Sequence, residues 1–312
     1  MKTLIEILQP YNTIAIAGMA KNAGKTTTLN HMIDGFAALG AVLGLTSIGL
    51  DGEETDQVTS TPKPRIYVPA GTIIATAEQL LARRGQGIND IARQILAVTD
   101  CATPLGRVVI ARALSPGHVM LAGPSMVSQI PPIVRILQDA GATKTIIDGA
   151  VGRKSLAVPE VAQAVVLATG AGLSRSMETV IAQTAHISAI FNLPKTLLVG
   201  ASCARPLHIP GAITDAKIDG FYDHHIIADD PTKILITPKA LAKLKLSGGQ
   251  ISVKNPINLA AITINPTSPY GTNFDPDDFL AKMQQATNTP TFNIFNIVGA
   301  SCTRPIPKED KC

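Results

Sequence analysis

The chain has 312 residues, 46% of them hydrophobic, and a mean hydropathy of +0.23, which indicates a globular protein with one large α/β domain or two smaller ones. The formal net charge is only +4, and the Lys and Arg residues are spread along the sequence. Because aromatic residues make up 4% of the chain and Trp is absent, a nucleic-acid partner is not expected.

The first strong pattern is a strand, a short loop and a helix. An apolar run over Thr13–Gly18 predicts a buried strand, and the loop after it ends in Gly24-Lys25-Thr26-Thr27. Apolar residues then recur at helical spacing up to Gly40, at Leu29, Met32, Ile33 and Phe36. This order is typical of a phosphate-binding loop, in which backbone amides and the positive end of a helix face an anion.

In such a loop Lys25 reaches the β- and γ-phosphates and the Thr26 hydroxyl ligates Mg²⁺. The match to the motif is incomplete, because Met19 stands at the first glycine position and Gly18 precedes it, so we expect an altered loop entrance. A simpler alternative is that Gly-Lys-Thr only caps a helix, but the strand before it favours a nucleotide. The candidate nucleotide-binding residues are Lys21, Asn22, Ala23, Gly24, Lys25, Thr26 and Thr27.

Two acidic residues follow predicted strands. Asp51 comes after an apolar run over residues 41–49, and Asp148 ends a run over residues 143–147. In an open parallel sheet both would lie at the carboxyl edge, where ligands bind. We therefore expect Asp51 and Asp148 to share metal ligation with Thr26, and to act with Lys25 in catalysis. The alternative for Asp148 is an ordinary turn aspartate.

The rest of the pattern alternates strands and helices. Helices are predicted at residues 76–84 and 88–98, from about Ser125 with Pro131 and Pro132 in its first turn or at a kink, and from about Ser174. Strands are predicted at residues 107–112, 118–122, 163–169, 195–200, 259–264 and 292–298. This alternation predicts an α/β fold with a doubly wound, mainly parallel sheet of the P-loop NTPase type, with helices on both faces.

The sequence becomes rich in turn-forming residues after residue 200. Residues 1–200 are predicted to form the nucleotide-binding core, residues 201–231 a turn-rich inserted lobe, and residues 232–312 a portion that returns strands to the same sheet. The segment Val-Gly-Ala-Ser-Cys-x-Arg-Pro occurs twice, over residues 199–206 and 298–305. If the two copies end neighbouring strands, Arg205 and Arg304 would form an anion site; the alternative is two solvated strand ends.

The cysteines and the apolar segments bear on location. Four cysteines are far apart with no C-x-x-C pair, and the N-terminus has no charged-then-apolar leader, so a reduced cytoplasm is expected. The most apolar window, residues 36–50, is too short and too rich in Gly, Thr and Ser to span a bilayer, so no membrane role is expected. The adjacent pair His224-His225 favours packing over a metal site.

Several segments together resemble one family. These are AGMAKNAGKTTTLN, GLTSIGLDGE, TIIDGAVGRKS, VVLATGAGLSRSMETVI and INPTSPYGTNFDP. Their order and wording resemble the P-loop subunit of lysine 5,6-aminomutase reactivase and its bacterial relatives, over most of residues 13–300. The resemblance implies a cytoplasmic nucleotide-dependent factor that helps to reactivate an adenosylcobalamin (B12)-dependent aminomutase, with a MutS-like ATPase subunit as partner.

The chain is also similar to a broader class that includes dethiobiotin synthetase and the MinD and ParA ATPases. The signature lysine of the latter falls on Ala20 here, with Lys21 one residue later, which puts a lysine contributed across a dimer in doubt and leaves a homodimer open. No N-K-x-D guanine signature is found, so ATP is favoured and GTP remains open.

Two functions follow from these patterns. The first is an Mg-dependent ATPase that remodels a partner enzyme, with a variant in which the protein is a small-molecule kinase or ligase whose second substrate lies against residues 170–175 and 265–271. The second is a nucleotide-sensing module with negligible turnover, which Met19 and the lack of an evident catalytic base favour.

Overall fold

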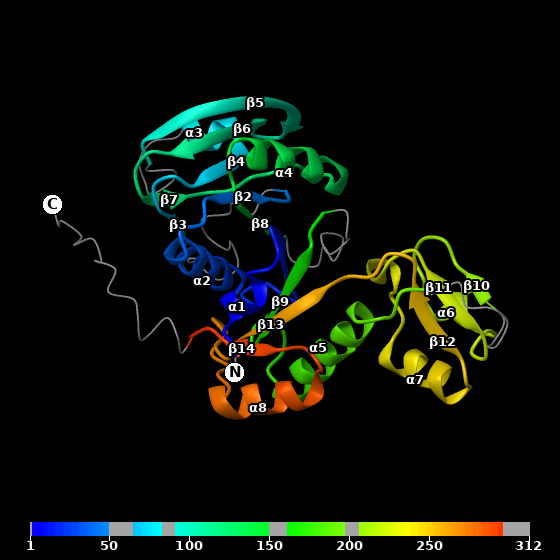
Figure 1. The fold of residues 1–312 in the computed structure, drawn as a ribbon. Helices are drawn as coiled ribbons and strands as arrows, with labels where there is room; N and C mark the ends of the chain where they lie inside the picture. Colours follow the sequence, from blue (N-terminus) through cyan, green and yellow to red (C-terminus); the bar gives the residue numbers. More distant parts are fainter. Residues whose placement is uncertain (1, 50–64, 83–90, 150–160, 197–205, 296–312) are drawn as a thin grey trace.

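The computed structural model describes residues 2–49, 65–82, 91–149, 161–196 and 206–295. Within these residues, nine strands form one central sheet (Figure 1). They are β1 (Thr13–Gly18), β2 (Leu43–Ser47), β4 (Ile73–Ala77), β5 (Arg93–Thr103), β6 (Gly106–Ala113), β8 (Lys144–Asp148), β9 (Ala164–Gly170), β13 (Leu259–Asn265) and β14 (Thr291–Asn293). Their order is β14-β13-β9-β1-β8-β2-β4-β6-β5. The predicted α/β class is confirmed.

Most of the sheet is parallel. The strands from β14 to β4 in this order pair in parallel. At one edge, β6 pairs antiparallel with both β4 and β5. Every residue of β1, β2, β9 and β13 is buried. Parallel strands covered on both faces read as continuous apolar runs, which is why these strands were recognisable in the sequence.

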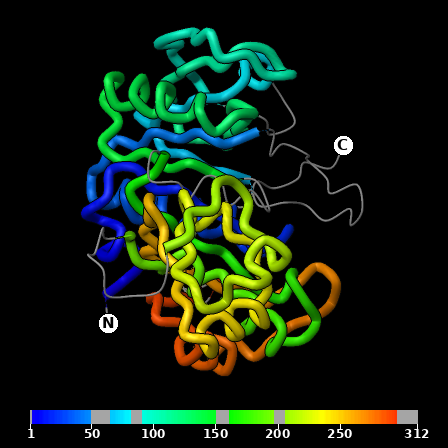
Figure 2. The backbone as a smooth tube through the Cα atoms, turned by 90° about the vertical axis from the view of Figure 1, so that its right-hand side faces the viewer, coloured from blue at the N-terminus to red at the C-terminus, as the bar shows by residue number. Residues whose placement is uncertain are grey.

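Helices cover both faces of the sheet (Figures 1 and 2). On one face lie α1 (Leu4–Leu8) and α2 (Lys25–Ala38), and on the other α4 (Ile130–Asp139), α5 (Met177–Phe191) and α8 (Pro276–Ala286). Alternate residues of β1 pack against the two helix layers: Ile14 and Ile16 pack with α2, whereas Ala15 and Ala17 pack with α5. The prolines of α4 lie in its first turn, as predicted.

Short elements complete the core. A two-stranded antiparallel sheet pairs β3 (Ile66–Val68) with β7 (Gly117–Val119), and the 3₁₀ turn η1 (Val127–Gln129) leads into α4. The amide group of Asn30, on α2, donates to the carbonyl of Arg65 at 2.9 Å and accepts from the amide of Tyr67 at 3.1 Å. This pair of bonds fixes the small sheet to the side of α2.

The helix predicted over residues 88–98 is wrong. In the described part of that stretch, β5 begins at Arg93 and pairs antiparallel with β6, as a hairpin that turns at Pro104-Leu105. Its exposure alternates along the strand, and Ile95 and Val98 remain half exposed. Non-local pairing with β6 therefore overrides a local apolar spacing that also suits a helix.

The helix predicted over residues 76–84 is shorter in the structure. It is α3 (Glu78–Ala82), because Thr76 and Ala77 complete β4. The buried Thr76 hydroxyl donates to the carbonyl of Met120 at 3.0 Å and accepts from the amide of Ala122 at 2.9 Å. These bonds hold Thr76 in the sheet.

A separate lobe lies beside the core, on the right in Figure 1. It is built on a parallel three-stranded sheet with short helices packed on it. Its elements are β10 (Pro206–His208), α6 (Asp215–Ile218), β11 (His225–Ala228), η3 (Pro231–Lys233), α7 (Pro238–Leu246) and β12 (Gln250–Val253). The lobe thus extends beyond the predicted boundary at residue 231, and the chain returns to the central sheet only at β13.

The repeated segment lies almost entirely outside the described residues, and so do Arg205 and Arg304. The described beginnings of the two strands that were expected to carry it are in different sheets. Lys195 bridges to Val253 of the lobe sheet, whereas β14 pairs with β13 of the central sheet. The expectation that these strands are neighbours in one sheet is therefore not met.

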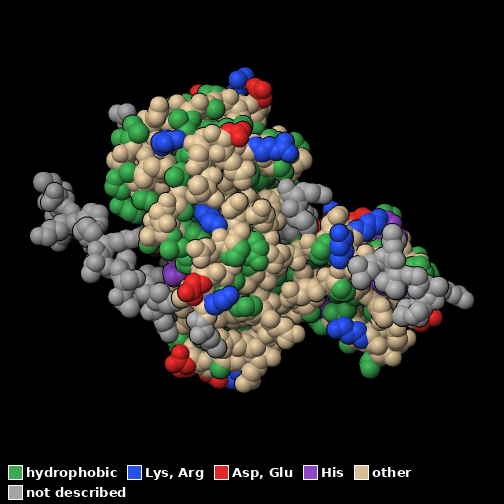
Figure 3. All heavy atoms as spheres, viewed as in Figure 1, with side chains coloured by type: hydrophobic (Ala, Val, Ile, Leu, Met, Phe, Trp, Pro, Cys, Tyr) green, Lys and Arg blue, Asp and Glu red, His purple; other side chains and the backbone are tan. Residues whose placement is uncertain are grey.

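On the face shown in Figure 3, Lys and Arg side chains are scattered among Asp and Glu and form no continuous patch. None of the helices in the described ranges is both long enough and apolar enough to cross a membrane.

His31 should make stability depend on pH. Burial on α2 lowers the pKa of its imidazole, and nearby Asp34 raises that pKa by less. In the unfolded chain the ring titrates near pH 6.5, so below that pH the unfolded state binds a proton that the folded state resists. The free energy of unfolding should therefore fall as the pH drops below about 6.5.

We expect His31→Gln to lose this acid-side component and to follow the wild-type pH dependence above pH ~7.5, where the His31 imidazole of wild type is neutral in both the folded and the unfolded state. Urea unfolding at a series of pH values measures it. An acid-side slope that the substitution leaves unchanged would contradict the assignment.

Candidate functional site

The loop between β1 and α2 has an unusual backbone. Its first residue, Met19, still donates from its amide to the carbonyl of Ala168 on β9 at 2.9 Å. Asn22 and Gly24 both have positive φ angles, 59° and 91°. A Cβ atom on Gly24 would lie 3.1 Å from the Phe295 ring and 3.2 Å from the Cβ of Asn265. Glycine is therefore required there both by backbone conformation and by space.

The start of α2 is open to an anion. Gly24 is its N-cap residue, and no described side chain caps the helix there. The first amides of a helix have no carbonyl partner within it, and together with the helix dipole they attract negative charge. The half-buried Thr26 and Thr27 lie in this first turn, next to the buried Lys25.

Lys25 folds back over the end of β1. Only 8% of the residue is exposed. A Cβ atom on Gly18 would lie 2.7 Å from its Cδ and 3.2 Å from its Nζ, so the stem of Lys25 passes directly over this glycine. Among the described residues, its ammonium has no hydrogen-bond or ion-pair partner. The Lys25 stem therefore approaches the backbone closely at Gly18. Met19, the next residue, stands at the first glycine position of the expected motif.

Asp148 lies at the same edge of the sheet as the loop. It ends β8, which pairs in parallel with β1, and it stands opposite Ile16 in register. Gly149 donates from its amide to the carbonyl of Ile16 at 3.0 Å, and Ile48 donates to the carbonyl of Asp148 at 3.0 Å. The residue is only 4% exposed. Asp148 therefore lies at the carboxyl edge of the sheet, at the end of the strand that neighbours β1.

The other predicted site residues have the following positions. Ala23 is buried and Lys21 is exposed, while Asn22 is half buried with a left-handed backbone. The structure therefore brings the run from Lys21 to Thr27 and the end of β8 to one sheet edge. Asp51 lies outside the described residues.

Sequence reasoning missed the role of Asn265, the last residue of β13. Its amide nitrogen donates to the carbonyl of Asn22 at 2.9 Å, and its amide oxygen accepts from the backbone and the hydroxyl of Thr267 at 3.0 and 2.9 Å. The amide nitrogen thus holds the loop, while the amide oxygen bonds to Thr267, just after β13. An asparagine at the end of a buried strand, followed by Pro266, is the pattern that could have indicated it.

A second contact fixes the helix that follows the loop. The Thr28 hydroxyl lies 2.8 Å from that of Thr263 on β13 and donates to the carbonyl of Gly24 at 3.1 Å. Both side chains are buried. The loop and the first turn of α2 are therefore both attached to β13, a strand that comes more than two hundred residues later in the sequence.

The candidate oxygen ligands suit a magnesium ion. Mg²⁺ prefers hard oxygen ligands and commonly takes one or two from the protein, with the remainder from water and phosphates. The Thr26 hydroxyl at the helix start and the Asp148 carboxylate on the neighbouring strand are such ligands at one sheet edge.

No protein-family model matches the chain, and a search of curated proteins found no match either.

Asn265→Asp tests how the loop is held. The substitution keeps the acceptor for Thr267 but replaces the donor to Asn22 with an oxygen that faces a carbonyl. Leaving a buried polar group without its partner costs about 1–3 kcal/mol. We expect faster hydrogen exchange over residues 19–24, measured by mass spectrometry.

Asn258→Asp is the control at the other end of β13, because the exposed Asn258 lies just before that strand and its amide donates to the carbonyl of Gln163 at 3.0 Å. Unchanged loop exchange in Asn265→Asp, or an equal increase in the control, would show that Asn265 does not hold the loop.

Proposed function

We propose that the protein binds Mg-ATP at the loop between β1 and α2 and hydrolyses it. The observation that carries the proposal is Lys25, a residue only 8% exposed, whose stem folds over Gly18 and whose ammonium has no counter-ion among the described residues, beside the uncapped start of α2. A lysine beside free helix-start amides places positive charge and hydrogen-bond donors together, so an anion is expected there.

A nucleotide phosphate suits this anion site better than an isolated carboxylate would. The amides at the helix start, together with those of the loop before it, would supply the backbone donors that commonly surround phosphates. The lysine contributes a point charge without fixed geometry, as it does in other phosphate sites. ATP is chosen over GTP because no guanine signature was found in the sequence.

Hydrolysis would require charge neutralisation and alignment more than covalent chemistry from the protein. Lys25 would balance charge on the transferred phosphoryl group, and the first-turn amides would hold it in place. Thr26 and Asp148 would hold the magnesium ion, which supplies further neutralisation when it is bound. Asp51, which lies outside the described residues, is proposed as a second acidic residue near the ion.

A nucleotide-sensing module with negligible turnover is the second candidate. The described residues offer no evident base to orient an attacking water, and this favours the second candidate. Both candidates use the same residues to bind the nucleotide. Phosphate release with saturating Mg-ATP distinguishes them directly.

The cellular role is a proposal that rests on the resemblance described above. The protein would assist the reactivation of an adenosylcobalamin-dependent aminomutase together with a MutS-like ATPase subunit. The kinase or ligase variant would instead require a second small substrate at the same sheet edge. Recovery of aminomutase activity after inactivation, with and without this protein and Mg-ATP, tests the reactivase proposal.

Lys25→Ala should remove most of the stabilisation by nucleotide. A ligand that binds only the folded state adds RT ln(1 + [L]/Kd), or about 2.7 kcal/mol at a hundredfold excess over Kd. Thermal unfolding with and without Mg-ATP measures it. Lys245→Ala, at an exposed position on α7, is the control and should respond like wild type. Equal responses in all three proteins would refute the assignment of the loop.

Asp148→Asn should reduce turnover much more than affinity. The substitution keeps the size of the side chain but removes the negative charge from the metal shell, and that charge matters most as the transition state forms. We expect kcat to fall about a hundredfold, with the Kd for Mg-ATP changed far less. Phosphate release and equilibrium binding give the two numbers. An equal loss in both would indicate a binding role alone.

A further inference from the structure

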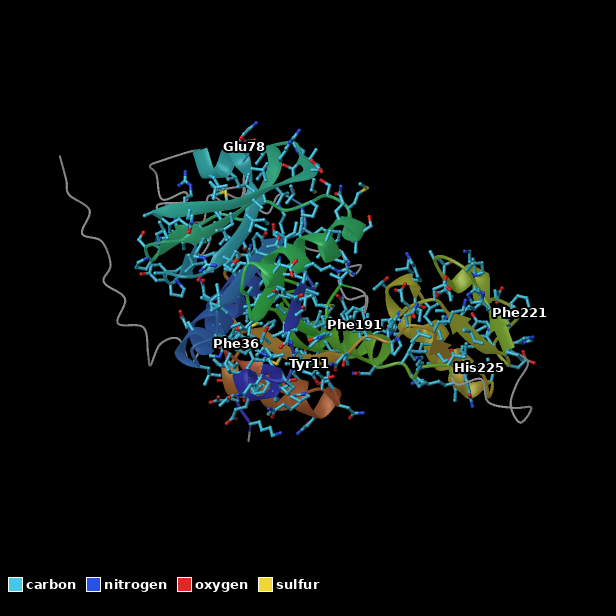
Figure 4. All side chains as sticks on the ribbon, turned by 45° about the horizontal axis from the view of Figure 1, so that its top comes forward. Tyr11, Phe36, Glu78, Phe191, Phe221 and His225 are labelled. Atoms are coloured by element: carbon cyan, nitrogen blue, oxygen red, sulfur yellow. The ribbon has the colours of Figure 1, made fainter. Side chains whose placement is uncertain are left out.

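A cavity of about 360 Å³ adjoins the loop on the α5 side of the sheet. Its walls come from both the core and the lobe, and include Ala17, Met19, Leu167, Ile187, Phe191 and Pro238. In Figure 4, Phe191 lies on the part of α5 that faces the lobe. Well-packed interiors contain few voids larger than a water molecule, and this volume is within the range of ligand sites.

The walls define the chemistry of a ligand. None of the lining residues is Asp, Glu, Lys or Arg. A charged group placed there would lose its hydration without compensation, so the buried part of the ligand must be neutral and largely apolar. Dispersion and apolar burial would supply the affinity.

Polar atoms are found only at a few places in the lining. His186 has its Nε2 2.9 Å from the carbonyl of Ile236, which precedes α7, so this nitrogen already joins α5 to the lobe. Ala182 and Gln183 are exposed on α5, so the cavity reaches the surface beside them. The Gln183 amide can therefore meet one uncharged polar group of a ligand at the mouth.

The cavity shares a wall with the loop entrance. A Cβ on Gly18 would point towards Lys25, whereas the neighbours Ala17 and Met19 pack on the α5 side. Met19 is also attached through its amide to β9. A ligand in the cavity would thus press on Met19, one residue from the glycine that supports the lysine. A methionine can adapt its shape to such a contact, which a glycine at this position could not provide.

We propose that this cavity binds a small neutral molecule with an apolar body, and that its occupancy is linked through Met19 to binding at the loop. The first half, ligand binding in the cavity, rests on the cavity alone. The second half rests on the proposed nucleotide function.

The first half is tested with N-phenyl-1-naphthylamine, a neutral apolar probe whose fluorescence rises on leaving water. Wild type should bind it saturably. Ala182→Phe places a ring at the cavity mouth and should weaken binding about tenfold or more. Ala189→Phe makes the same change at an exposed position on the same helix outside the lining, and should bind like wild type.

Three results would overturn the site: no saturable binding by wild type, equal binding by Ala182→Phe, or an equal loss in Ala189→Phe. Thermal unfolding of both variants checks that each is folded before the titration. Because the two substitutions are the same on one helix, a general effect of the added ring would affect both.

The second half is tested by measuring the Kd of Mg-ATP with and without saturating probe. Linkage is reciprocal, so we expect a change of about fivefold in each affinity, which Met19→Ala should abolish while both ligands still bind. Unlinked binding of both ligands in wild type would overturn the linkage. Failure of Mg-ATP to bind would refute both the nucleotide function and the linkage. The probe titration would still test, independently, whether the cavity binds a ligand.

Discussion

The positive charge of Lys25 lies beside the uncapped start of α2, where a bound anion could balance it. The stem of the lysine is held over Gly18, and the amides of α2 begin beside it. Both depend on β1 lying within the sheet, between β8 and β9, so that its carboxyl end opens onto the ends of two other strands. The sheet order, rather than the loop sequence alone, determines what surrounds the charge.

The loop is held mainly by distant parts of the chain. Asn265 bonds to its backbone, Thr263 bonds to the helix after it, and Ala168 accepts from Met19. A left-handed residue such as Asn22 carries a conformational cost that the surroundings must offset. Binding groups held in this way lose little freedom when a ligand arrives, because the order already exists in the folded protein.

Local patterns were sufficient for the parallel core. The strand, loop and helix around Lys25 and the placement of Asp148 follow from continuous apolar runs and their polar ends, which any fully covered parallel sheet produces. The role of Asn265, the strand β5 and the extent of the lobe were not predicted. Each depends on pairing between residues far apart in the sequence, and short apolar stretches such as residues 91–98 suit a helix and a strand almost equally.

The hairpin of β5 and β6 forms one edge of the sheet, where a second molecule could pair with the edge strand. β5 is a long strand with one side unpaired in the described structure, and it exposes half of Ile95 and 56% of Val98, features that invite pairing with another chain. Its register with β6 shifts twice, between Ile95 and Ala97 and between Val98 and Ala102. Such irregularities bend and twist a strand, so the straight length that a second molecule could extend is only a few residues. The irregular register of β5 therefore limits edge-to-edge pairing between molecules, at the strand that was wrongly predicted to be a helix.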